Sequence, residues 1–186
     1  MLTDTRSGYG WISIALHWLA AIAIIYLFID GNQMEDLHDR VARAAIRDWH
    51  MAIGATLSIL LLARVLWRVR SGAPEQLPGP PMLNRLAKAI HIGLVLTILA
   101  AVGSGLLLPW SMGNPIPLLG GLSIPSPLPQ MHWLHEAMEG IHSVSVHLFI
   151  PLVALHVLGA LKHAVIDRDG TMQRMLRPGR SGTPAE

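Results

Sequence analysis

Histidine is the residue type through which this sequence has most scope for chemistry. The chain contains ten histidines and no cysteine, so imidazole nitrogens rather than thiolates are its natural transition-metal ligands. His17, His50, His142 and His156 lie within apolar stretches of the sequence. Ionisable side chains in such stretches are costly at membrane depth and are usually functional. We therefore take these four histidines as candidate metal ligands.

The sequence has four apolar stretches, three of which carry these histidines, and each is close to the roughly 20 residues that a helix needs to cross a bilayer. Hydrophobic residues make up 52% of the chain and charged residues 14%, against about 25% charged in soluble domains. We predict an all-α integral membrane protein, a four-helix bundle with up-down-up-down topology. The alternative, a soluble core of buried helices, requires an unusual number of such stretches in 186 residues. The predicted spans are residues 12–29, 50–67, 89–108 and 141–161.

Lysine and arginine are distributed unevenly between the two ends of these spans. If both termini are cytoplasmic, eleven of the fourteen basic residues fall on the cytoplasmic side, which is the usual bias of membrane proteins. The other side keeps Arg40, Arg43 and Arg47, in a loop that also carries acidic residues. We predict a multi-pass inner-membrane protein whose N and C termini are both cytoplasmic.

The rest of the chain is predicted to serve this one membrane unit. Residues 1–178 are expected to form a single transmembrane domain, and residues 179–186 a mobile tail. The connection over residues 109–140 is rich in proline and glycine, so no continuous helix is expected there. We interpret its proline-rich part as an ordered cap over the outer face.

The depths of the four histidines predict that they meet in two pairs. His17 and His156 each lie about six residues from the cytoplasmic end of a span, and His50 and His142 each open a span at the outer side. His142 and His156 are separated by nearly four helical turns. They therefore share one helix face, about 21 Å apart. We predict that His17 pairs with His156 and that His50 pairs with His142.

Two neutral imidazoles that face each other across a bundle suit the iron of a haem. Such a ligand set fills both axial positions, which favours electron transfer over oxygen binding. A hydrogen-bonded packing role or a proton relay is the alternative for histidines in a membrane. Zinc is disfavoured, because the chain lacks cysteine and no acidic residue lies inside the predicted spans. The haem would be non-covalent, since the CxxCH attachment motif is excluded.

Two further residues have positions that suit a bound haem. Arg64 lies fourteen residues after His50 on the same helix face, at the depth of the inner pair. Its guanidinium could bind a haem propionate, or the side chain could simply extend to the membrane surface. Gly54 follows His50 by one helical turn and would allow a flat ring to approach the backbone closely.

The remaining histidines have weaker cases. His91 lies near the inner end of the third span beside Lys88, where it could bind a quinone carbonyl or simply occupy the interface. His135 and His163 lie near the ligand face but at the span ends, so we keep them as substitute ligands. The others are interpreted as surface residues or as pointing away from the ligand face: His38, His132 and His147.

Five segments, spread over nearly the whole chain in the same order, carry a resemblance to a known family. The sequence resembles the bacterial di-haem cytochrome b561 proteins, whose members include the superoxide oxidase of the inner membrane. The segments are ALHWL at 15–19, WHMAIG at 49–54, RVLWR at 64–68, GNPIPLLGGLSIP at 113–125 and LHVLGALKHAVIDRDGTMQRML at 155–176.

The resemblance implies a cofactor set and a reaction. It assigns His17 and His156 to a cytoplasmic b-type haem and His50 and His142 to a periplasmic one, so that two b haems carry electrons to ubiquinone. The family often has further histidines where this chain has Lys88 and Ala164. The quinone is nevertheless expected near the inner haem, with His91, Lys88 and His163 as candidate contacts.

The electron donor is the part of the reaction that the sequence defines least. Superoxide is one candidate, because Arg43 and Arg47 would attract an anion in an otherwise acidic loop. The alternative is a haem-bearing membrane anchor that exchanges electrons between quinone and a periplasmic redox protein. A non-redox transporter with a histidine proton relay is a third class. The lipid bilayer is an expected partner and nucleic acid is not, because the net charge is only +2.

Overall fold

Four long helices make up most of the described part of the chain, which in this computed structural model covers residues 1–72, 74–75 and 79–179. They are α1 (Trp11–Asp36), α2 (Arg40–Ser71), α3 (Pro81–Ser111) and α4 (His132–Lys162). Each is long enough and apolar enough to cross a membrane. The predicted all-α membrane fold is confirmed.

The helices run well beyond the apolar stretches that predicted them. α1 continues to Asp36, so Asp30 is helical and lies inside the bundle instead of in a loop. α2 begins at Arg40, where Asp39 caps it by accepting a hydrogen bond from the Val41 amide at 2.9 Å. α4 begins at His132, nine residues before its apolar stretch. The loop predicted around the three outer arginines is therefore wrong, because hydropathy marks only the lipid-contacting part of a helix.

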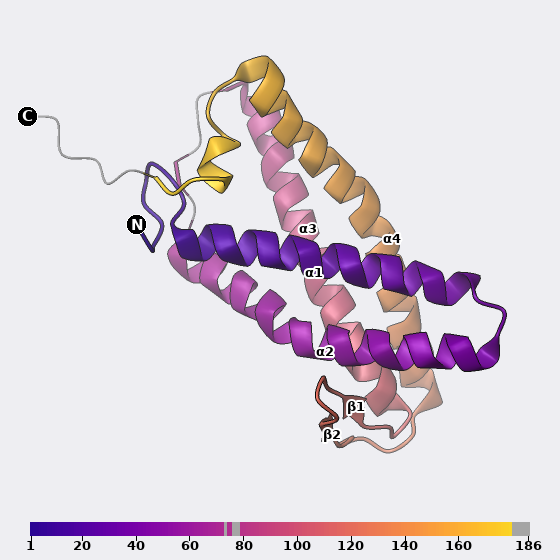
Figure 1. Cartoon of the computed structure of the whole chain (residues 1–186). Helices are drawn as coiled ribbons and strands as arrows, with labels where there is room; N and C mark the ends of the chain where they lie inside the picture. The colour runs from indigo at the N-terminus through magenta and orange to yellow at the C-terminus, as the bar shows by residue number, and fades with distance from the viewer. Residues whose placement is uncertain (73, 76–78, 180–186) are drawn as a thin grey trace, which may run out of the picture.

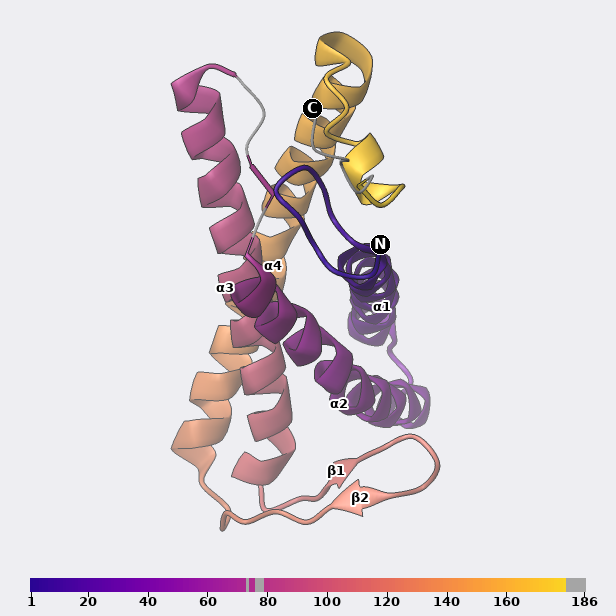
Figure 2. The ribbon, with the colours of Figure 1, turned by 90° about the vertical axis from the view of Figure 1, so that its left-hand side faces the viewer.

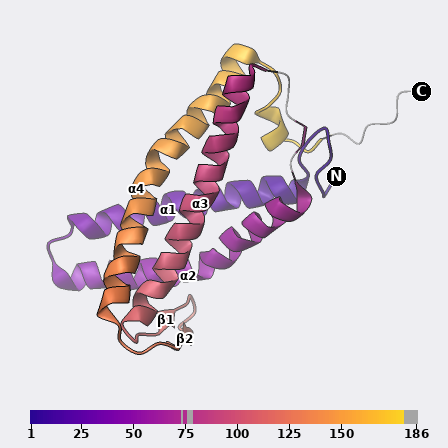
Figure 3. The same cartoon turned by 180° about the vertical axis from the view of Figure 1, so that it is seen from behind.

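The helices form two antiparallel hairpins, α1 with α2 and α3 with α4 (Figure 1). α3 and α4 lie side by side along most of their length (Figure 3), and Gly93 permits their close approach, because a Cβ there would meet Leu152 Cδ1 at 3.2 Å. The two hairpins diverge from each other rather than running parallel (Figures 1 and 2). We call the end that holds both termini the proximal end, and the opposite end the distal end.

The connection between α3 and α4 is ordered at the distal end. It contains a two-stranded antiparallel sheet, β1 (Ile116–Pro117) and β2 (Ser123–Ile124). Gly120 and Gly121 make the turn between the strands with positive φ angles of 86° and 79°. The sheet extends beneath α2 (Figure 2), where the Leu119 amide donates to Thr56 Oγ1 at 3.1 Å.

The two terminal segments meet at the proximal end. After α4 the chain forms a π-helical turn, η1 (His163–Asp167), and a short 3-10 turn, η2 (Gln173–Met175). The indole Nε1 of Trp18 donates to the Met175 carbonyl at 2.8 Å, and the Gly179 amide donates to the Tyr9 carbonyl at 3.0 Å. The C-terminal segment thus closes over the start of α1. The predicted mobile tail begins at Gly179, and its remaining residues lie outside the described part of the chain.

The outward faces of the helices are apolar. Ile22, Ile59, Leu96 and Leu158, one from each helix, are each at least 60% exposed. In water such faces would be unstable, whereas in a bilayer they contact lipid tails at no cost. The polar side chains that do lie between the helices are therefore the ones that need a functional explanation.

Candidate cofactor site

The four candidate histidines meet between the helices in two pairs. The ring centroids of His17 on α1 and His156 on α4 are 6.1 Å apart, and those of His50 on α2 and His142 on α4 are 6.4 Å apart. Two imidazoles that share one metal ion at about 2 Å from each nitrogen have their centroids roughly 6 Å apart. Both spacings therefore suit a single ion between the rings. The pairs are those that the sequence predicted, one proximal and one distal.

Hydrogen bonds at the distal pair orient both rings for metal binding. His142 Nδ1 lies 2.9 Å from the Ala101 carbonyl, which can only accept, so Nδ1 carries the proton. His50 Nδ1 lies 3.2 Å from Oδ2 of Asp30, which is buried. In both rings this leaves the Nε2 lone pair free. A second partner of this kind commonly fixes the orientation of a metal-binding histidine.

The proximal pair has a different hydrogen-bond partner. Arg64 Nη2 lies 2.9 Å from His17 Nδ1, and a guanidinium can only donate, so Nδ1 accepts and the proton of a neutral ring sits on Nε2. An iron at His17 Nε2 would move that proton to Nδ1. Arg64 would then need another acceptor, and a haem propionate within its reach would supply one. The proximal pair thus fits a haem when Arg64 turns from His17 to the cofactor.

Glycines on α3 and α1 leave room for the two rings of the distal pair. A Cβ added at Gly105 would lie 3.2 Å from His142 Cε1, and one added at Gly31 would lie 3.5 Å from His50 Cε1. Gly54, the glycine predicted to approach a cofactor, lies against α1, with Leu27 Cδ2 at 3.8 Å from its added Cβ. Its approach to a haem stays a prediction, and the close approach that the structure shows is that of Gly105 to His142.

Arginines line a cavity immediately outward from the distal pair. Arg40, Arg43 and Arg47 recur every three or four residues and share one face of α2. Arg47 precedes His50 by three residues, and Glu139 precedes His142 by three, so two of the lining residues lie almost one helical turn from the histidines. Its volume is about 490 Å³, and its lining residues are Met34, Arg40, Arg43, Ala44, Arg47 and Glu139.

Two of these arginines have their own partners. The Arg43 guanidinium donates to the Leu37 carbonyl, with Nε at 2.8 Å, and Arg47 pairs with Asp48 at 3.3 Å. Both side chains are exposed, so these contacts are weak and exchangeable. The cavity wall therefore retains a positive face on α2, against one carboxylate from α4.

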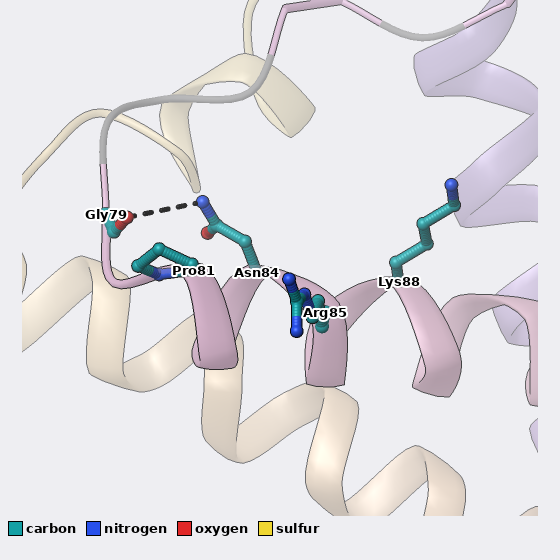
Figure 4. A pocket seen from close by; sticks show the side chains of 5 residues that line it. All are labelled: Gly79, Pro81, Asn84, Arg85 and Lys88. Carbon is teal, nitrogen blue, oxygen red and sulfur yellow. Dashed lines mark hydrogen bonds between the residues drawn. The ribbon is translucent and has the colours of Figure 1, made fainter.

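His91 lies beside the proximal pair. The sequence predicted it as a quinone contact near the inner end of the third span but did not predict its contact with His156. Its ring centroid lies 5.2 Å from that of His156, and the residue is exposed on α3. Lys88 lies almost one turn earlier, where it lines a shallow cavity of about 290 Å³ with Arg85 at the start of α3 (Figure 4). His91 is thus the residue of the predicted quinone group that adjoins the candidate cofactor site.

The predicted substitute ligands His135 and His163, and also His147, have other partners. His163 bonds Asp169 Oδ2 at 2.7 Å, in the turn after α4. His135 Nδ1 lies 3.1 Å from Ser111 Oγ, at the distal ends of α3 and α4. His147 Nδ1 bonds the Ser143 carbonyl of its own helix at 2.8 Å, on an exposed face. Each of these three histidines thus has a hydrogen-bond partner away from the two pairs.

Sequence reasoning missed the residues that support the ligands. Asp30 was taken for part of an acidic loop, because it follows the last apolar residue of the first stretch. The Ala101 carbonyl belongs to the backbone and has no sequence signal. Arg40 could have been found from its helical spacing to Arg43 and Arg47, and Glu139 from its spacing to His142, had the helices been extended beyond their apolar parts.

A membrane bundle that holds two histidine pairs at different depths is the architecture of a membrane cytochrome b. Comparison with known sequences agrees. The prokaryotic cytochrome b561 family matches residues 8–178, and this chain belongs to that family.

Individual relatives match over nearly their full length. Cytochrome b561 homolog 2 from Escherichia coli (strain K12) is 36% identical over 177 residues, covering 94% of each chain. A protein named probable superoxide oxidase CybB, from Yersinia pestis, is 24% identical over 90% of this chain and 95% of its own. Cytochrome b562 from Cereibacter sphaeroides is 25% identical over 92% and 96%.

The family defines the general activity. This is a bacterial membrane protein of b-type haem electron transfer, and an oxidoreductase in that general sense. The residues present fit such a group, because the distal rings present free Nε2 atoms and both pairs have the spacing of two imidazoles on one ion.

Proposed function

We propose that the protein oxidises superoxide on the periplasmic side of the inner membrane and passes the electrons through two b haems to ubiquinone. The cavity with three arginines on one wall, two of whose lining residues lie almost one helical turn from His50 and His142, carries this proposal. An anion drawn into that cavity would stand next to the distal pair. The relative from Yersinia pestis, named a probable superoxide oxidase, supports the same reaction.

The reaction balances when two superoxide anions are oxidised for each ubiquinone that is reduced. Two superoxide anions lose one electron each and leave as two molecules of dioxygen. One ubiquinone accepts the two electrons with two protons and becomes ubiquinol. When bound, the two haems supply one-electron transfer between these half-reactions. His50 and His142 would hold the distal haem, and His17 and His156 the proximal haem.

At the distal end the task of the chain is to attract and position an anion. Arg43 and Arg47 offer exposed guanidinium groups, and a cavity in which three arginines outnumber one carboxylate raises the local concentration of a small anion. Dioxygen is neutral, so the same charges do not retain the product.

At the proximal end the chain must orient a quinone and supply protons. His91 is exposed on α3 with its ring 5.2 Å from that of His156, so a quinone carbonyl could accept a hydrogen bond from it at the edge of the proximal haem. Arg64 would bind a propionate there. Lys88 and His163 lie farther along the proximal end and would act on protons or lipid instead of on the quinone itself.

The first experiment counts haem in the purified protein. A reduced-minus-oxidised spectrum with a pyridine haemochrome assay should give two b haems per chain. Replacement of His50 or His142 by Ala should remove one of them, and replacement of His17 or His156 the other. A protein that binds no haem would contradict the proposed cofactor assignment and favour a histidine proton relay.

The second experiment tests the donor. Purified protein should form ubiquinol when superoxide is generated beside it, and the rate should fall as ionic strength rises. Replacing both Arg43 and Arg47 by Gln should slow the reaction by at least about tenfold and weaken its salt dependence. Arg70→Gln, an exposed arginine at the other end of α2, is the matched control. Reduction by a periplasmic redox protein, with none by superoxide, would instead identify the chain as a membrane anchor.

A further inference from the structure

Asp30 is a buried carboxylate whose presence the proposed reaction does not explain. It lies on α1, is 7% exposed, and has Oδ2 at 3.2 Å from His50 Nδ1. A carboxylate among apolar helices is costly unless it is paired, and such residues are usually functional. The described contacts of Asp30 are directed to a predicted ligand of the distal haem.

The partner of Nδ1 differs between the two pairs in the sign of its charge. His50 faces the carboxylate of Asp30, and His142 faces the neutral carbonyl of Ala101. His17 faces the guanidinium of Arg64. The distal pair therefore has an anionic side chain next to it and the proximal pair a cationic one. Charge and hydrogen bonding around the ligands are among the main controls of the reduction potential of a bound haem.

We propose that Asp30 sets the direction of electron transfer by holding the distal haem at a lower reduction potential than the proximal haem. A carboxylate that accepts a hydrogen bond from the Nδ1–H group of His50 makes the ring a stronger electron donor and stabilises the oxidised iron. Arg64 keeps a positive charge beside the proximal pair whether it bonds His17 or a haem propionate, so it has the opposite effect there. Electrons that enter at the distal end therefore move downhill toward the quinone. This inference rests on the proposed assignment of His50 to the distal haem.

The backbone around Asp30 is built to keep this contact. Gly31 follows it on α1, and a Cβ there would lie 3.5 Å from His50 Cε1. α1 therefore approaches the ring with both residues, the carboxylate at Nδ1 and the glycine beside Cε1. Asp30 acts through His50, so it is a positioning residue and does not touch substrate.

Replacement of Asp30 by Asn tests the negative charge of the side chain with almost no change in its shape. The amide keeps an oxygen that can accept from His50 Nδ1, but the negative charge is lost. Redox titration of the purified protein should give a distal potential shifted upward by at least tenfold in the reduction equilibrium, about 59 mV for one electron. The reduction potential of the proximal haem should be unchanged. In a separate variant, Asp30→Glu, which keeps the negative charge, the distal potential should lie closer to that of the unaltered protein than it does in Asp30→Asn.

Asp36→Asn is the matched control, because it removes the same charge from an exposed position at the same end of α1 and should leave both potentials unchanged. An Asp30→Asn protein with two haems and an unchanged distal potential would overturn the inference. If the Asp30→Asn variant loses its distal haem, the two reduction potentials of the unaltered protein provide the test. The haem that disappears when His50 is replaced must be the one with the lower potential in the unaltered protein, and the reverse order would overturn the inference as well.

The same titration distinguishes this inference from the proposed function. If replacing His50 removes no haem, the cofactor assignment itself is contradicted. If replacing His50 removes the distal haem but the distal potential does not respond to Asp30→Asn, only the tuning role of Asp30 is contradicted.

Discussion

Arg64 and Asp30 give the two histidine pairs opposite electrostatic surroundings, although both side chains act on the same atom type, a histidine Nδ1. Arg64 has the more changeable role, because its bond to His17 cannot persist once His17 Nε2 binds a metal. Its guanidinium is then available to a propionate, where a bidentate pair would form.

Arg64→Ala should therefore weaken haem binding at the proximal pair by about 10- to 100-fold, the usual cost of removing a residue that supports a bound metal group. Arg64→Lys should lie between, because it keeps the charge but not the planar fork. The measurement is haem occupancy of the proximal site during titration with haem. Arg70→Ala, an exposed arginine later on α2, should leave it unchanged. Equal binding in Arg64→Ala and the unaltered protein would contradict the propionate role.

Gly105 provides a second test at the residue scale, through space instead of charge. Gly105→Ala would put a Cβ 3.2 Å from His142 Cε1, which should displace the ring and lower distal haem occupancy by at least about tenfold. Gly103→Ala is the matched control, because nothing lies within 4 Å of its added Cβ. Both changes favour the helix by about 1 kcal/mol, so a difference in haem content between them reports on His142 alone.

At the scale of helices, hydropathy predicted which stretches cross the membrane but not where the helices end. The outer arginines and Asp30 read as a polar loop, yet they continue α2 and α1 because helical hydrogen bonds do not require apolar side chains. The pairing of the histidines could be predicted, because depth in a membrane is fixed by distance along a helix. Their support by Asp30 could not, because it depends on how α1 rotates against α2.

The segment after α4 provides a prediction about pH. Burial raises the pKa of Asp169, but hydrogen bonds from Thr171 and His163 outweigh it and lower the pKa to about 2, from an ordinary value of 3.8. A depressed carboxylate pKa stabilises the fold above the unfolded value, and that contribution is lost as pH falls from about 4 to about 2. The C-terminal segment should therefore detach from α1 within that window.

Trp18 reports on this detachment, because its indole donates to the Met175 carbonyl in the folded segment. Its fluorescence should change as pH falls from about 4 to about 2. Asp169→Asn should remove the transition from that window, and Trp18→Phe should remove the signal. An identical acid transition in Asp169→Asn would show that another group is responsible.

For the whole molecule, the distribution of basic residues predicts the orientation, and the absence of cysteine makes it measurable. Leu122, in the sheet turn at the distal end, is 68% exposed, and Arg177 is exposed at the proximal end. In spheroplasts, Leu122→Cys should react with a membrane-impermeant maleimide, and Arg177→Cys should react only after permeabilisation. The reverse pattern would place the arginine cavity on the cytoplasmic side and exclude a periplasmic donor.

Both histidine pairs draw one ring from α4, the last of the four long helices in the described part of the chain. During synthesis, neither pair can therefore exist until the ribosome has made about three quarters of the protein. His142 emerges before His156, so the distal pair can be completed first, and the C-terminal segment then closes over Trp18 beside His17. A nascent chain that stops between His142 and His156 would have a complete distal site but no proximal site to receive its electrons. The order of synthesis therefore makes the proximal site the last step of assembly.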